Sequence, residues 1–287
     1  MSLLIQLRYR IKAIDTIKKI THAMRLISMS ARSRLKTKEE PLRHYIQTSG
    51  NLLARLQANA PSWKNAVLHP SDTAGQKPLI ILIGSQRGLC GNFNTVLFHY
   101  LEKILAEQFD DYITKIDFIP VGKKAVNYAE DNVHFHIVQK YTELNARTIS
   151  EIAHALTEYL FTQPEPFTQV LVISNHLKTF FVQKPQKTQL IPFIASENPK
   201  KSFDTSDQYQ WEQSPQQILD QLARSTIESE LHYLLFESLL AEHAARFISM
   251  DNATRNAQIL LEETQLQYNK LRQAKITKEL TELVSNI

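Results

Sequence analysis

The sequence predicts an α/β fold in which long helices at the two chain ends pair as an antiparallel coiled coil beside a Rossmann-like α/β domain. Residues 214–287 contain no glycine and, after Pro215, no proline, and residues 1–40 contain neither. Strand and helix patterns alternate between these two segments, which favours a mainly parallel sheet. We therefore expect an N-terminal shaft helix over 1–60, an α/β globular domain over 77–195 and a C-terminal shaft helix over 214–287.

The length of the C-terminal segment explains why the ends should pair. At about 1.5 Å of rise per residue, a helix over most of this segment would be about 105 Å long, and the helix over 1–40 about 60 Å. Neither can fold back into a compact core, so each needs a partner. Residues 1–43 carry eleven Lys or Arg against three acidic residues, whereas residues 214–287 carry seven basic and ten acidic side chains, so charge also favours their pairing.

The first helix has an apolar stripe that we expect to face its partner. The stripe is formed by residues three or four positions apart: Leu7, Ile11, Ile14, Ile17, Ile20, Met24 and Ile27. Pro41 either kinks this helix or ends it, and the pattern resumes before Pro61. Residues 60–78 then have the composition of a linker.

The middle of the chain reads as alternating strands and helices. Strands are expected at 79–83, 116–121, 133–138 and 169–174, and helices at 93–109, 123–129 and 148–161. Segments 180–182 and 188–193 predict a closing hairpin around Pro185, and the prolines favour the edge of the sheet. The C-terminal helix should begin at Ser214, because Ser214, Pro215 and Gln217 form an N-cap, a first-turn proline and a capping-box glutamine.

The loop at 84–92 follows a strand and precedes a helix, where α/β folds bind phosphates. Its glycines, Gly84, Gly88 and Gly91, match neither the dinucleotide nor the nucleoside triphosphatase motif, so we interpret the loop as a tight turn. Cys90, the only cysteine, is interpreted as an inert packed thiol. His134 and His136 would share a strand face, but no third metal ligand lies at a suitable spacing.

Acidic residues and histidines also gather in the C-terminal helix. Because the chain has no Glu-x-x-His motif, we interpret this group as a solvated charged face and not a di-iron site: Glu228, Glu230, His232, Glu237, Glu242 and His243. No catalytic, cofactor or metal site is predicted. These observations favour a mechanical or scaffolding protein. A coiled-coil adaptor or a nucleic-acid-binding protein that uses the basic first helix stays open as an alternative, followed by an enzyme that uses the Gly84 loop.

The chain resembles the γ subunit of F-type ATP synthases along nearly its whole length. The resemblance is carried by four blocks in the family's order: Ile11–Met24, Arg87–Asn94, Glu242–Ala257 and Tyr268–Ser285. It implies a non-catalytic rotor shaft that couples rotation of the membrane c-ring, driven by protons or sodium ions, to ATP synthesis or hydrolysis at the β subunits. The partners it implies are the α and β subunits of the hexamer, the ε subunit and the c-ring, with no nucleic acid and no cofactor.

The resemblance also implies contact residues. Residues expected to touch the α/β hexamer are Met24, Arg25, Lys270, Arg272, Gln273 and Thr277. Trp211 and Glu212 are expected to meet the c-ring and ε. No apolar run approaches the roughly 20 residues of a membrane span, and no removable leader is recognised. We therefore expect a peripheral protein on the cytoplasmic side of a bacterial inner membrane.

Overall fold

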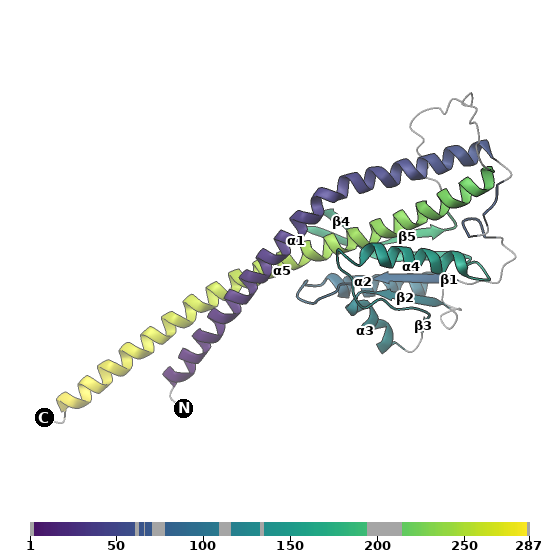
Figure 1. The fold of residues 1–287 in the computed structure, drawn as a ribbon. Coiled ribbons are helices and arrows are strands. Elements are labelled where there is room, and N and C mark those ends of the chain that lie inside the picture. The colour runs from purple at the N-terminus through teal and green to yellow at the C-terminus, as the bar shows by residue number, and fades with distance from the viewer. Residues whose placement is uncertain are drawn as a thin grey trace.

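A computed structural model of the chain describes residues 3–60, 63–65, 67–70, 78–108, 116–132, 135–193 and 214–285. The helices are α1 (Leu3–Asn59), α2 (Phe93–Gln108), α3 (Lys123–Asp131), α4 (Ile149–Thr162) and α5 (Pro215–Ser285). The strands are β1 (Pro78–Ile83), β2 (Asp117–Val121), β3 (His136–Ile137), β4 (Gln169–Thr179) and β5 (Val182–Ile191). Figure 1 shows that the long end helices, α1 and α5, lie side by side and that the sheet packs beside the first half of α5.

The five strands form one sheet in the order β3-β2-β1-β4-β5. β1 lies at the centre and pairs in parallel with β2 and β4, and only the β4–β5 pair is antiparallel. All six residues of β1 are buried, as expected for an apolar strand that is covered on both faces. The predicted, mainly parallel sheet is confirmed.

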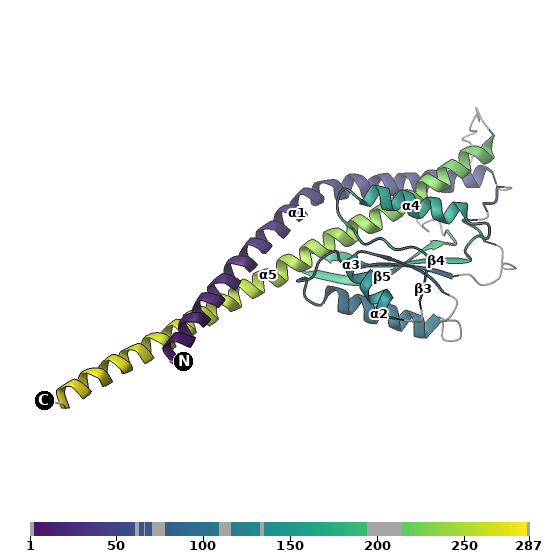
Figure 2. The ribbon, with the colours of Figure 1, turned by 60° about the horizontal axis from the view of Figure 1, so that its bottom comes forward.

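Alternate β1 side chains enter two separate cores. Leu79, Ile81 and Ile83 pack with α4 and the first half of α5, whereas Ile80 and Leu82 pack with α2 and α3. The layers therefore run from α2 and α3 through the sheet to α4 and α5, and α1 covers α5 on the outside (Figure 2). Because α5 belongs to the core of the sheet domain, the domain and the shaft are joined by a continuous helix.

Away from the sheet, α1 and α5 continue together as the predicted two-helix shaft, which is confirmed. The far end of α5 reaches beyond the N-terminal end of α1 in both views (Figures 1 and 2). At its other end, α5 begins as expected, since the backbone N–H of Gln217 donates to Ser214 Oγ at 3.4 Å. Among the described residues, no helix has a stretch apolar enough to cross a membrane.

Two prolines marked local expectations. Of the two outcomes left open at Pro41, an end or a kink, the helix does not end: α1 continues through Pro41 to Asn59 and changes direction between its two halves (Figure 1). Pro41 and Thr37, whose carbonyl loses its amide partner, are both exposed, so water can satisfy that carbonyl. The predicted hairpin turn around Pro185 is wrong. The hairpin turns at residues 180–181, and Pro185 lies inside β5, the edge strand, where a missing N–H is tolerated as predicted.

Candidate functional site: a two-helix shaft clamped to the sheet

The two helices of the shaft run antiparallel. Thr254 Oγ1 donates to Thr21 Oγ1 at 2.9 Å, and the hydroxyls of Ser49 and Thr226 lie 3.1 Å apart. Between these two contacts the chain advances 28 residues along α1, from 21 to 49, and goes back 28 residues along α5, from 254 to 226. Because the register is the same at both contacts, each step of one residue up α1 corresponds to one step of one residue down α5. The α5 residue opposite any α1 residue therefore follows from the residue numbers.

The face of α1 that packs against α5 repeats every seven residues. One set of buried or half-buried positions is Leu7, Ile14, Thr21, Ser28, Leu35, Leu42, Ser49 and Leu56. The second set alternates with the first, and each of its members lies three residues before one member of the first set. It consists of Leu4, Ile11, Lys18, Arg25, Arg32, Glu39, Ile46 and Leu53. We call these two sets the seam. A strict seven-residue repeat over eight heptads specifies a left-handed coiled coil.

The seam is apolar at both ends of α1 but polar in its middle. Between Lys18 and Arg32 its members are basic or hydroxylic, and Arg25 Nη1 lies 2.6 Å from Asp251 Oδ1 across the helices. Ser28 is buried and donates to the carbonyl of Met24 at 2.8 Å. On the α1 side this stretch of the shaft therefore offers polar contacts, although Met250 and Ala257 of α5 are buried at the same level.

The apolar stripe expected to face α5 is only partly correct. Leu7, Ile11 and Ile14 lie on the seam, but Ile17, Ile20 and Ile27 are 53%, 56% and 61% exposed. Each of the exposed residues comes one position before a seam residue, which turns it about 100° around the helix. The middle of α1 therefore presents polar residues to α5 and an apolar stripe to the outside, the reverse of a free-standing coiled coil.

The predicted contact residues fall into two levels of the shaft. Met24 is half-buried, and Arg25 pairs with Asp251. Lys270 lies 19 residues beyond Asp251, so about 28 Å further along the shaft. Exposed side chains at that second level include Arg272, Gln273 and Thr277. Trp211 and Glu212 lie outside the described residues.

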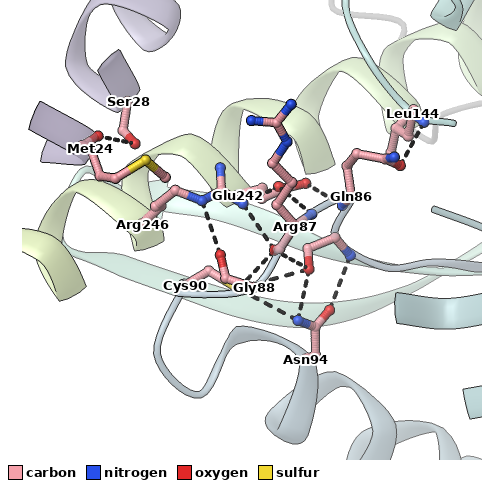
Figure 3. A network of polar contacts seen from close by, with 11 residues as sticks. Met24, Ser28, Gln86, Arg87, Gly88, Cys90, Asn94, Leu144, Glu242 and Arg246 are labelled. Atoms are coloured by element: carbon pink, nitrogen blue, oxygen red, sulfur yellow. Dashed lines mark hydrogen bonds and ion pairs between the residues drawn. The ribbon is translucent and has the colours of Figure 1, made fainter. Parts of the chain in front are cut away.

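The loop over residues 84–94 is bound to α5 through two buried charges, Glu242 and Arg246. The carboxylate of Glu242 accepts hydrogen bonds from the backbone N–H of Gln86 at 2.9 Å and of Arg87 at 3.4 Å. Arg246 donates to the carbonyl oxygens of Arg87 at 3.0 Å and Gly88 at 3.2 Å, and pairs with Glu242 (Figure 3). The side chains of Glu242 and Arg246 are 3% and 4% exposed. We call this arrangement the clamp.

Hydrogen bonds made by the loop's own side chains fix its backbone in the conformation that Glu242 and Arg246 bind. Asn94 Oδ1 accepts from the Ser85 N–H at 3.0 Å, and its Nδ2 donates to Ser85 Oγ at 2.8 Å. Gln86 Oε1 accepts from the N–H of Leu144 at 3.0 Å. The amides of Gln86 and Arg87 that could have faced a phosphate instead bind Glu242, so the loop binds the sheet domain to α5.

A close crossing of two backbones fixes the start of this loop. A Cβ atom at Gly122, whose φ is +90°, would lie 2.4 Å from the carbonyl oxygen of Gly84. The N–H of Gly84 donates to the carbonyl of Val121 at 2.9 Å, and that of Gly122 to the carbonyl of Tyr141 at 2.7 Å. Glycine is required at 122 because any side chain would push the two strand ends apart.

The acidic and histidine group of α5 is not the solvated face that the sequence suggested. Glu237 and Glu242 are 7% and 2% exposed, because this part of α5 is covered by α1 on one side and the sheet domain on the other. Burial, together with the nearby charges of Arg246 and Arg34, lowers the pKa of His243 to about 4. The missed signal was the surrounding sequence: from Leu234 to Ala245 every residue outside this acidic and histidine group is apolar except Ser238, which is typical of a buried helix.

Cys90 lies in the clamp region and is buried, with its sulfur 3.5 Å from Asn94 Nδ2 and 3.7 Å from the carbonyl oxygen of Arg87. It is 4% exposed and packs with Phe93, Ala241 and Ala245. Burial raises the pKa of the Cys90 thiol, which disfavours the reactive thiolate. Within the described residues, no three potential metal-binding side chains gather in one place. The contacts that the clamp does make, to the backbone of Gln86, Arg87 and Gly88, join the sheet domain to α5.

Known proteins match this chain over nearly its whole length. A family model described as ATP synthase matches residues 4–287. The chain is 30% identical to the ATP synthase gamma chain of Pelagibacter ubique, over 99% of this chain and 98% of that one. It is 31% identical to the gamma chain of Chlorobium limicola, over 97% and 96%.

Solved structures share the fold. The Tetrahymena thermophila mitochondrial ATP synthase, solved as its central stalk and c-ring, contains a chain that matches with a TM-score of 0.58 and 19% identity. The match covers 82% of this chain and 99% of that one. A chain of the Euglena gracilis mitochondrial ATP synthase, solved with OSCP, F1 and the c-ring, gives a TM-score of 0.56 at 16% identity, over 92% and 94%.

Proposed function

Because the chain belongs to the gamma-chain family of F-type ATP synthases, whose members form the rotor of the central stalk, we propose how the shape of this chain performs the work of a rotor. The shaft turns inside the hexamer of α and β subunits and changes the nucleotide affinity of each β subunit in turn. It carries no reacting group. Each angle of an asymmetric shaft presents a different surface to a given β subunit, and differential contact is what shifts a conformational equilibrium.

The observation that best supports this proposal is the outward apolar stripe of α1. Ile17, Ile20 and Ile27 face away from α5 while polar residues fill the seam behind them. In a free-standing coiled coil this arrangement would expose apolar area to water with no compensating gain. It is favourable if the shaft is enclosed by other subunits. A coiled-coil adaptor working alone in water would have the opposite pattern.

Asymmetry of the shaft has a second source in the unequal helix lengths. α5 passes beyond the N-terminal end of α1, so the tip is a single helix whose apolar residues are exposed, including Ile276, Leu280 and Leu283 at 48%, 58% and 65%. Basic side chains lie beside them at Lys275 and Lys278. We assign the tip to an apolar bearing in the hexamer, with basic side chains directed at acidic partner loops.

The contact residues implied by the family resemblance are part of the same proposal. Met24 and Arg25 contact a β subunit at one level of the shaft, and the stretch from Lys270 to Thr277 contacts the hexamer about 28 Å further on. Trp211 and Glu212 contact the c-ring and ε at the foot. The assembly is peripheral to a bacterial inner membrane, on its cytoplasmic side, and is held there by the ring.

Co-purification tests the proposal directly. A tagged chain expressed in its own organism should bring down α, β and ε, and the complex should hydrolyse ATP. The alternative of a nucleic-acid-binding or adaptor protein predicts co-purified nucleic acid or other partners without ATPase subunits. That second result would reject the rotor function.

A further inference from the structure

The β4–β5 hairpin extends beyond the sheet as a two-stranded arm. β1 pairs with β4 only as far as Ile173, whereas β4 and β5 stay paired from Ser174 and Gln186 to the turn at 180–181. We call residues 174–186 the arm. A two-stranded hairpin is marginally stable alone in water, so the arm depends on what it packs against.

The arm lies along α5 and contacts successive turns of that helix. His176 Nδ1 lies 2.7 Å from Glu237 Oε1. Leu177, one residue on, packs against the cluster that contains Ala241 and Ala245. Because 237, 241 and 245 are spaced by four residues, they form one row along the helix, and the arm follows this row away from the sheet.

The tip of the arm also reaches α1. The guanidinium carbon of Arg32, a seam residue of α1, lies 4.3 Å from the ring centroid of Phe180. The same ring contacts Phe247 of α5 with centroids 5.3 Å apart. One aromatic side chain of the sheet domain therefore touches both shaft helices. Its neighbour Phe181 is 75% exposed and contacts Phe180 edge-on.

We propose that the arm is a strut that transmits torque from the sheet domain to α1, with Arg32 and Phe180 as its positioning residues. The inference rests on the rotor function proposed above. α5 receives torque directly, because the clamp and the domain core hold it to the sheet. α1 shares the domain core through Leu35, Leu53 and Leu56, but on the other side of Leu35 its seam is polar between Lys18 and Arg32. The contact at Arg32 braces α1 where this polar part of the seam begins.

The test uses the complete ATP synthase in membrane vesicles. Phe180→Ala and Arg32→Gln should leave assembly and ATP hydrolysis intact while ion pumping per ATP hydrolysed falls about twofold or more. Hydrogen exchange at the amides of the arm should become about tenfold faster, since each change removes one cation–π contact and Phe180→Ala also removes two aromatic pairs. Arg32→Lys, which keeps the cation, should restore most of the pumping ratio.

Phe181→Ala is the matched control, because it removes an exposed ring from the same turn but leaves the contacts of Phe180 with Arg32 and Phe247, so it should change both measurements far less than Phe180→Ala. Wild-type pumping ratios in both Phe180→Ala and Arg32→Gln would overturn the strut while leaving the rotor function untouched. The rotor function fails separately, if the wild-type chain does not assemble with α and β.

A cross-link gives an independent test in the assembled enzyme, because it replaces the contact between the two side chains with a covalent one. Cysteines placed at Arg32 and Phe180 are joined in the assembled enzyme by a short bismaleimide, with Cys90→Ser as background. A strut that turns together with α1 predicts full hydrolysis and pumping after cross-linking. Loss of turnover in the cross-linked enzyme would mean that the arm must move relative to α1, and would overturn the inference.

Discussion

Removing the buried carboxylate of the clamp should release the 84–94 loop from α5. In Glu242→Gln, the guanidinium of Arg246, whose side chain is 4% exposed, loses its counter-charge inside the protein. The amides of Gln86 and Arg87 also lose their charged acceptor. Breaking one side of a buried ion pair costs about 3–5 kcal/mol. The lower figure corresponds to about a hundredfold increase in the open fraction of the loop, at about tenfold for each 1.4 kcal/mol.

Hydrogen exchange measures that fraction directly, because the amides of Gln86 and Arg87 exchange only when their bonds to residue 242 open. We expect both to exchange about a hundredfold faster in Glu242→Gln. The double variant Glu242→Gln with Arg246→Met should recover part of the protection, since it removes the uncompensated cation as well. Glu279→Gln is the control: it breaks an exposed pair with Lys275 and should shift stability by less than about 0.5 kcal/mol. Exchange within about threefold of wild type in Glu242→Gln would refute the clamp.

Further predictions concern stability and coupling. The lowered pKa of His243, about 4 against an ordinary 6.5, means that the unfolded chain binds a proton in this range that the folded chain does not. Stability should therefore rise between about pH 4 and 6.5 by up to about 1.4 kcal/mol per pH unit, and His243→Gln should flatten that slope in urea titrations. Gly122→Ala should destabilise the chain by about 3 kcal/mol, from a positive φ and a 2.4 Å clash, whereas Gly50→Ala, in an open position of α1, should stabilise it by about 1 kcal/mol; equal unfolding midpoints would contradict both. Met24→Lys should lower ion pumping per ATP more than assembly, and normal coupling would show that Met24 is not at the sliding contact.

The regular elements followed from local sequence patterns because each pattern has one favourable structure. The apolar run from Leu79 to Ile83 is short and lies between Pro78 and Gly84, which favours a strand covered on both faces over a helix, and Ser214-Pro215 supplies the geometry of a helix start. The absence of glycine and proline at the chain ends allowed the long helices, and their length required a partner.

Three features depend on long-range contacts that local patterns do not contain. Ile17 and Ile20 fit an inward stripe as well as an outward one, and the choice depends on Arg25 meeting Asp251 in α5. The sequence near Glu242 does not distinguish it from an exposed acidic residue, because its burial comes from the sheet domain, which is distant in sequence. The turn at Phe180 is set by contacts of its ring with α1 and α5, which outweigh the turn tendency of Pro185.

The measurement that most directly tests the account is observation of single molecules with the α and β hexamer fixed to a surface. A reporter attached to a cysteine at the exposed Phe181 position marks the sheet domain without touching the shaft. The account predicts one-directional rotation of the reporter that starts with ATP and stops when ATP is removed. A chain that stays bound in the hexamer while ATP is hydrolysed and the reporter does not turn would contradict it.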